Sequence, residues 1–218
     1  MTYTGTVTVG GSADLRELPD LAISKLAVGP HDNNAYLLRC QATGAQLLVD
    51  AAAEADRLLE LVGEDGLATV VTTHAHPDHW GALAAVVAAT GAETVAHAAD
   101  AGDIAVPTDR AVHDGDDVRV GRVTLTAIHL VGHTPGSIAL LYDDPTGPPH
   151  LFTGDCLFPG GVGNTWKDPA RFASLYEGVV TKLFDRLPDE TWVYPGHGRD
   201  TTIGAERPHL AEWRARGW

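Results

Sequence analysis

Hydrophobic residues along the chain mark a series of short segments, and most of these predict β-strands. Some of the segments alternate apolar and polar positions, and others are continuous apolar runs rich in β-branched residues. The predicted strands are residues 5–9, 21–28, 35–38, 46–50, 67–71, 93–97, 118–120, 123–128, 138–142, 151–153 and 191–194. Turns rich in Gly, Pro, Asn and Asp separate many of them, including residues 29–34 and 114–117.

Three further segments predict helices: residues 55–62, residues 82–87 and a long stretch that begins at Pro169. In the long stretch apolar residues recur at three- and four-residue spacing as far as Leu187, which is typical of a face packed on a core. Asp168 is placed to cap this helix, with Pro169 in its first turn. Gly91 is expected to end the second helix in a left-handed cap.

Strands that alternate with helices over 218 residues predict one α/β domain spanning residues 1–218. No apolar run reaches 18 residues, so no membrane span is predicted. The first seven residues lack the basic start and apolar stretch of a secretory signal, and we expect a cytoplasmic protein. Cys40 and Cys156 are too few for a disulfide framework or a cysteine-based zinc site.

The charge balance narrows the possible partners. Twenty-nine acidic and fifteen basic residues give a formal net charge of −14. Such a surface repels nucleic acid backbones and anionic lipid, so neither is an expected partner. The sequence leaves the oligomeric state open.

One stretch concentrates metal-binding side chains: Thr72-Thr73-His74-Ala75-His76-Pro77-Asp78-His79-Trp80-Gly81. It follows the predicted strand 67–71, and open α/β sheets place their ligand sites at the carboxyl ends of strands. Imidazole suits zinc and iron, and a carboxylate adds charge and an acid/base group. His74 and His76 are two apart in extended chain and point to one side, whereas Asp78 and His79 follow the bend. This spacing indicates two metals.

A surface loop that happens to be rich in histidine is the alternative interpretation, and for a lone His-x-His it is the commoner one. Here four suitable groups fall within six residues, and three later segments add one each: His133, Asp155 and His197. Each of the three comes after a predicted strand and next to glycine. A carboxylate such as Asp155 can bridge two metals, which an imidazole rarely does.

Two other features have two interpretations each. Asp50 ends a predicted strand, where it could orient a ligand imidazole by hydrogen bonding to it or could cap the helix that follows. His31, Asp32, Asn33 and Asn34 could line a pocket or could simply form a turn.

The motifs His74-x-His76-x-Asp78-His79, Gly132-His133, Thr153-Gly154-Asp155 and Pro195-Gly196-His197-Gly198 together resemble the metallo-β-lactamase superfamily. The resemblance covers about residues 34–204. It implies an α/β (α+β) fold, a four-layer αββα sandwich of two mixed sheets with helices on both outer faces. It assigns one metal to His74, His76 and His133 and the other to Asp78, His79 and His197, with Asp155 as the bridge.

Within that superfamily, residues 154–158, 187–191 and 195–206 look most like the hydroxyacylglutathione hydrolase (glyoxalase II) branch. True β-lactamases generally have Cys or Ser at the position of Asp155, so the resemblance argues against lactamase activity. It implies hydrolysis of a small-molecule thioester on two divalent metal ions. Zinc is the expected metal, with iron or manganese as alternatives. Asp78 is the candidate catalytic residue, which would orient the nucleophile or move its proton.

The substrate side departs from the family pattern, because Gly163-Asn164-Thr165-Trp166 replaces the usual Gly-Arg-Thr or Gly-Arg-Phe. The acyl group and the thiol carrier are therefore left open. We expect Asn164, Lys167 and Arg199 to contact substrate. Lys167, Arg171 and Arg199 could hold a substrate carboxylate or could be exposed surface charges.

Other functions remain as alternatives. One is a mononuclear iron persulfide dioxygenase that uses His74, His133 and Asp155. Another is a hydrolase of lactones or phosphoesters. A third is a metal-dependent binding module, which need not keep so complete a set of candidate ligands.

Overall fold

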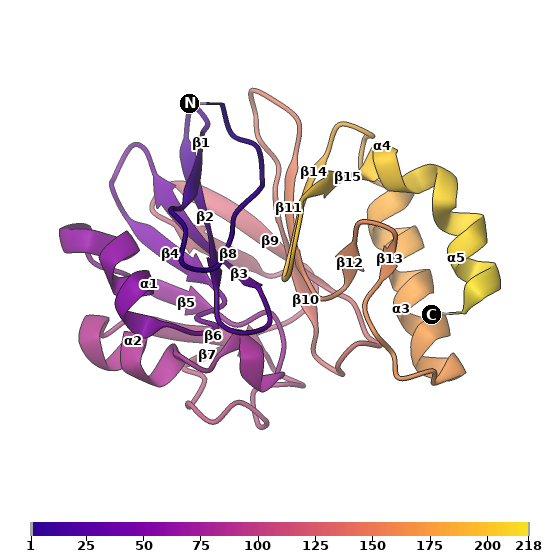
Figure 1. The fold of residues 1–218 in the computed structure, drawn as a ribbon, viewed down its shortest axis with the longest axis horizontal. Coiled ribbons are helices and arrows are strands. Elements are labelled where there is room, and N and C mark those ends of the chain that lie inside the picture. Colours follow the sequence, from indigo (N-terminus) through magenta and orange to yellow (C-terminus); the bar gives the residue numbers. More distant parts are fainter. Residues whose placement is uncertain (1, 218) are drawn as a thin grey trace.

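Two mixed β-sheets face one another in the computed structural model, which describes residues 2–217 (Figure 1). The first sheet has its strands in chain order: β1 (Asp14–Glu17), β2 (Leu21–Val28), β3 (Asn33–Cys40), β4 (Gln46–Val49), β5 (Thr69–Val71), β6 (Glu93–His97) and β7 (Arg110–Val112). Strands β1 to β4 are antiparallel, and β4 to β7 are parallel. The carboxyl ends of β4, β5 and β6 therefore lie at the same edge.

The second sheet has the order β15-β14-β11-β10-β9-β8. Its strands are β8 (Asp117–Val120), β9 (Val123–His129), β10 (Ile138–Tyr142), β11 (His150–Gly154), β14 (Trp192–Pro195) and β15 (Thr201–Thr202). Only the pair β11 and β14 is parallel. A small separate ribbon, β12 (Leu157–Phe158) with β13 (Gly161–Val162), follows β11.

Helices cover the outer face of each sheet (Figure 1). Helices α1 (Ala55–Val62) and α2 (Leu83–Thr90) pack on the first sheet, with Leu58 and Val86 in its outer core. Helix α3 (Pro169–Val179) and, after the short α4 (Ile203–Glu206), helix α5 (Leu210–Arg216) cover the second, with Leu175 and Trp213 buried there. The predicted αββα sandwich is confirmed.

The main core lies between the sheets and explains the alternation in the sequence. On β3 the even-numbered Tyr36 and Leu38 point into this core, and the odd-numbered Leu37 points toward the helices. The ring of Tyr36 meets Phe152 and Tyr194 of the second sheet edge to face, with centroids 5.3 and 5.6 Å apart. Aromatic contacts therefore join the two sheets directly.

Local signals for helix ends were confirmed. The Asp168 carboxylate accepts hydrogen bonds from the backbone N–H groups of Ala170 and Arg171, and Pro169 occupies the first turn. Gly91 ends α2 with φ 70°. The long helix predicted to run from Pro169 to Leu187 instead changes at Val180–Phe184 into a π-helical turn.

The predicted strand at residues 5–9 was wrong, because the backbone there has other partners. The Asp14 carboxylate accepts hydrogen bonds from the N–H groups of Thr4 and Gly5, and Gly5 has a left-handed φ of 71°. The first strand is β1 instead. Strand β14 is also not the last, since β15 pairs with it.

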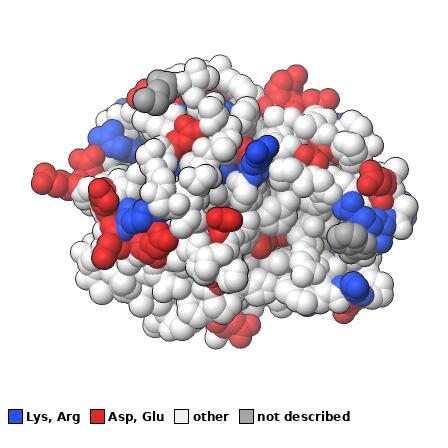
Figure 2. All heavy atoms as spheres, in the orientation of Figure 1, with Lys and Arg blue, Asp and Glu red and all other residues white. Residues whose placement is uncertain are grey.

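Within the part of the chain that the structure describes, none of the helices combines the length and apolar character that a membrane span needs. On the face shown in Figure 2, acidic and basic side chains are interspersed and form no broad basic patch.

Candidate metal centre

The histidine-rich segment follows β5, at the edge of the first sheet where its parallel strands end. A 3₁₀ turn at Pro77–His79 bends the chain there. Three loops of the second sheet meet this edge, those after β9, β11 and β14, and they carry His133, Asp155 and His197. A backbone hydrogen bond from Asn34 N to Gly196 O, at 2.7 Å, joins the two sheets beside the site.

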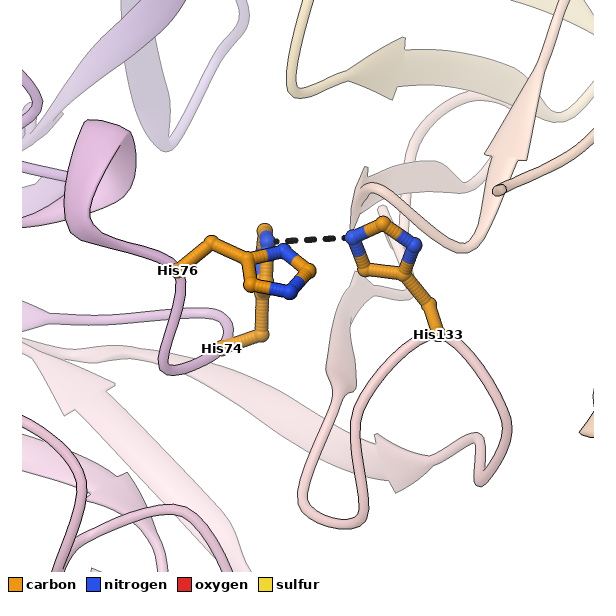
Figure 3. Close-up of side chains that lie close together, drawn as sticks. All are labelled: His74, His76 and His133. Atoms are coloured by element: carbon orange, nitrogen blue, oxygen red, sulfur yellow. Dashed lines mark hydrogen bonds between the residues drawn. The ribbon is translucent and has the colours of Figure 1, made fainter. Parts of the chain in front are cut away.

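His74, His76 and His133 form one group of side chains (Figure 3). One nitrogen of each ring lies within 4.8 Å of the others. The Nε2 atoms of His74 and His133 are 3.3 Å apart. His74 and His133 are buried, whereas His76 is partly exposed, so the group has one side open to solvent.

Asp78, His79 and His197 form a second group with the same compactness. Nε2 of His79 lies 3.2 Å from Nε2 of His197, which in turn lies 3.5 Å from Oδ2 of Asp78. His79 is fully buried, and the side chains of Asp78 and His197 are 32% and 24% exposed.

Asp155 lies between the two groups and reaches both. Its Oδ2 is 3.5 Å from Nε2 of His133 and 3.5 Å from Nε2 of His197. Its Oδ1 is 3.4 Å from Nε2 of His79, yet it is buried and has no hydrogen-bond partner among the described residues. Gly196 makes the close approach possible, because a Cβ there would lie 2.3 Å from Oδ1 of Asp155.

Hydrogen bonds to the second ring nitrogen determine where the proton of each imidazole sits. Nδ1 of His133 donates to the carbonyl oxygen of Asn164, and Nδ1 of His197 donates to that of His31, both at 2.8 Å. A neutral imidazole has one proton, so Nε2 of both rings presents a lone pair to the site. Metal-ligating histidines commonly have this arrangement.

Asp50 supports two of the candidate ligands that follow β5, His79 and His74. Its Oδ2 lies 2.8 Å from Nδ1 of His79 and accepts a hydrogen bond from the hydroxyl of Thr73, also at 2.8 Å. Since the Thr73 proton goes to Asp50, its oxygen is free to accept from Nδ1 of His74, 3.1 Å away. The alternative of a helix cap was wrong, because Glu54 precedes α1.

The pKa values divide the imidazoles into two kinds. Burial lowers the pKa of His133 to about 4 and that of His74 well below its ordinary value, so both are neutral. Burial alone would lower the pKa of His79, but two neighbouring carboxylates raise it to about 10. Burial would likewise raise the pKa of Asp155, yet the neighbouring imidazoles of His197 and His79 hold it well below its usual range. Positive charge is thus favoured beside Asp155.

The polar residues that precede and begin β3 lie at the site. Nδ2 of Asn33 donates to Oδ2 of Asp78 at 3.0 Å, whereas Asn34 donates to the carbonyl oxygens of Pro195 and Gly198. A cavity of about 530 Å³ opens beside Asp78, lined by Pro30, His31, Asn33, Ala52, Ala53, Pro77 and Asp78. Asp32 is the turn residue of the set, with φ 52°.

Two of the residues predicted to contact substrate, Asn164 and Lys167, lie in the loop after β13, and the third, Arg199, follows β14. All three are exposed, and the Asn164 carbonyl holds His133. Arg171 is already engaged, because its guanidinium donates to the carbonyl oxygens of Gly132 and His133.

The sequence did not single out Trp166, which is 50% exposed beside this loop. Its ring centroid lies 5.3 Å from that of His76 and 5.4 Å from that of His133, and the Arg171 guanidinium lies over it at 4.4 Å. Trp166 also has a left-handed φ of 54°, a strained conformation that is common at functional sites and that the sequence does not reveal.

Comparisons with known proteins agree with this geometry. A model of the metallo-beta-lactamase superfamily matches residues 28–197. A hydroxyacylglutathione hydrolase of Polaromonas sp. (strain JS666) is 41% identical over 165 residues, which are 74% of this chain and 60% of that relative. The chain thus spans less than two thirds of that protein's length.

Two solved structures share the fold at more than 30% identity. ETHE1 from Myxococcus xanthus is 31% identical with a TM-score of 0.75, over 88% of this chain and 84% of that one. TTHA1623 in a di-iron-bound form is 33% identical with a TM-score of 0.68, over 84% of this chain and 96% of that one.

Proposed function

The chain belongs to the metallo-beta-lactamase superfamily, and from that premise we propose that it is a metal-dependent hydrolase of small-molecule thioesters. Relatives named hydroxyacylglutathione hydrolase support thioesters as the substrate class, with 34% and 41% identity. They are longer than this chain, which spans 60% and 62% of them, so the substrate itself is left open.

The position of Asp155 is the observation that carries the proposal. Its two oxygens reach imidazoles of both groups, and its buried Oδ1 has no hydrogen-bond partner among the described residues. Lone pairs on Nε2 of His133 and His197 point to the same place. This donor set fits two divalent cations, for which nitrogen and carboxylate oxygen are the usual ligands. The proposed ligands are His74, His76 and His133 for one ion and Asp78, His79 and His197 for the other, with Asp155 shared.

Divalent ions held by these residues, with zinc as the proposed metal, would supply a water of lowered pKa and would polarise the thioester carbonyl. Asp78 would orient that water and accept its proton, because its carboxylate is half-buried at the mouth of the cavity. Burial would raise the pKa of Asp78, but the hydrogen bond from Asn33 keeps it below its ordinary value, so the carboxylate is ionised. A thiol has a pKa of about 8.5 and leaves as thiolate, so no separate acid is needed.

Metal analysis combined with a substrate panel tests this function. Protein purified without added metal should contain two ions per chain and should hydrolyse thioesters faster than lactones or phosphoesters. The Asp78→Asn variant should lose most turnover, since an amide cannot accept the proton. It should also bind one of the two ions more weakly, since a neutral amide is a poorer ligand than a carboxylate.

Two results would reject the proposal. One iron per chain with oxygen uptake would assign the protein to the persulfide dioxygenase class instead. Failure of the metal-loaded protein to hydrolyse any thioester, lactone or phosphoester would favour a binding module.

A further inference from the structure

We propose that Asp100 is a positioning residue for the group His74, His76 and His133, and that it acts on this group selectively. The inference rests on the proposed metal centre and goes further, because it assigns to one ion position a support that the other position does not share. Asp100 lies just after β6 and is completely buried. None of the candidate ligands is within twenty residues of it in sequence.

The Asp100 carboxylate joins the two loops that carry this group. Its Oδ2 accepts hydrogen bonds from the N–H of Ala75 at 2.9 Å and from the hydroxyl of Thr134 at 2.6 Å. Its Oδ1 accepts from the N–H of Gly136 at 2.6 Å. Ala75 stands between His74 and His76, and Thr134 follows His133. One side chain therefore holds a loop of the first sheet against a loop of the second.

The packing around Asp100 leaves little freedom. A Cβ on Gly136 would lie 2.7 Å from both Cγ and Oδ1 of Asp100, so only glycine admits this approach. Oγ of Ser137 lies 2.5 Å from Oγ1 of Thr134 and accepts from the N–H of Thr134 at 3.0 Å. Because the carboxylate can only accept, the Thr134 proton points to Asp100, and the Ser137 hydroxyl must donate to Thr134. The donor and acceptor of each hydrogen bond from Ser137 through Thr134 to Asp100 are therefore fixed.

Asp50 and Asp100 differ in which candidate ligands they support, because Asp50 reaches His74 through Thr73 as well as His79, whereas Asp100 supports only the group of His74, His76 and His133. They follow β4 and β6, the two neighbours of β5, and thus flank the histidine segment on both sides. Asp50 contacts His79 directly, as described above. The described contacts of Asp100 reach none of Asp78, His79 and His197. Loss of Asp100 should therefore loosen one ion position and leave the other.

A Zn²⁺ titration of the Asp100→Asn variant in competition with a chromophoric chelator tests this role. Asn is almost isosteric, but its amide N–H₂ would face one of the three donors. We expect wild-type protein to bind two ions. In the variant one dissociation constant should rise roughly 10- to 100-fold and the other should stay unchanged. Thermal unfolding of the metal-free variant checks that it is folded.

A second pair of variants carries the test if Asp100→Asn does not fold. Thr134→Val removes the hydroxyl with little change of shape and should weaken the same ion. Thr134→Ser keeps the hydroxyl and should restore wild-type affinity. A purely structural role would lower the melting temperature of metal-free Thr134→Val without weakening the binding of one ion selectively.

The outcomes separate this inference from the proposed function. Wild-type protein that binds no Zn²⁺ would reject the metal centre, and this role with it. Two ions in the wild type with equal loss of both in the variant, or with no loss, would overturn selective positioning by Asp100 and leave the proposed function intact.

Discussion

Asp50 and His79 form a buried pair in which Oδ2 of the carboxylate lies 2.8 Å from Nδ1 of the imidazole. Asp50 has a left-handed backbone, with φ 58°, which aspartate tolerates better than most residues. Its other oxygen accepts a hydrogen bond from the N–H of Thr73 at 2.7 Å. Asp50 is thus held in place from the backbone, and it in turn holds the His79 ring so that Nε2 faces His197.

Replacing Asp50 by Asn should weaken metal binding. The amide can donate to Nδ1 of His79, which would move the ring proton to Nε2 and remove the lone pair from the site. Loss of such a supporting contact typically costs about 10- to 100-fold in metal affinity. A Zn²⁺ competition titration measures the change. Unchanged affinity would show that the pair does not set the orientation of His79.

Asp155→Asn should leave at most one tightly bound ion per chain. The variant keeps the size of the side chain, but a neutral amide cannot share its oxygens between two cations as a carboxylate can. We expect turnover of the best thioester to fall roughly 100-fold or more, beyond the typical effect of a supporting residue. Metal analysis and steady-state kinetics check this, with the same change at the exposed Asp143 as control. Two ions and full activity would remove the shared-ligand model.

The buried His150 should make the protein less stable in acid. Its Nδ1 lies 2.9 Å from the Tyr194 hydroxyl, and its Nε2 has no partner among the described residues. Burial and the positive charge of Arg16 lower the pKa of His150 to about 4, although the negative charge of Asp144 opposes them. The unfolded chain binds the proton with an ordinary pKa of about 6.5, so the stabilisation is complete above that pH and is lost as the pH falls toward 4. The shift corresponds to about 3 kcal/mol.

Urea unfolding of the metal-free protein between pH 4 and 7 measures this contribution. His150→Phe should flatten the pH dependence of the free energy of unfolding, whereas the same change at the exposed His209 should not. An unchanged slope in His150→Phe would show that this ring is not a source of acid sensitivity.

Tyr36→Phe should cost only about 1 kcal/mol, although the Tyr36 hydroxyl is buried and donates to the Pro195 carbonyl at 2.6 Å. The reason is that Asn34 also donates to this carbonyl, at 2.9 Å, so no buried polar group loses its last partner. For a chain of this length the melting temperature should fall by about 2–4 °C. A loss above roughly 3 kcal/mol would mean that the hydroxyl, and not the ring, joins the sheets.

Much of the fold could be predicted because its strands are buried on regular patterns. Strand 21–28 and helix 55–62 have the predicted bounds. The missed elements lack such patterns. Strands β12, β13 and β15 have two residues each, and the turns and helices over 203–216 are mixed in polarity. The wrong strand at residues 5–9 shows that alternation alone does not supply a pairing partner.

The site residues that could be predicted are those that lie in the histidine motif or directly after a predicted strand. The structure brings His74, His76, Asp78, His79, His133, Asp155 and His197 together at one edge. Asp100 was missed because a lone Asp after a strand predicts a turn, although its place beside Asp50 on neighbouring strands was an available signal. Substrate contacts at Asn164, Lys167 and Arg199 stay predictions, because all three side chains are exposed.

The division of the seven side chains between the sheets also has a consequence for the order of folding. Four of them follow β5 in the first sheet, and three follow β9, β11 and β14 in the second. An intermediate with only one half assembled would present no more than four of the seven, without the carboxylate of Asp155 if that half were the first. Metal binding should therefore follow the assembly of both sheets, and it should not nucleate folding.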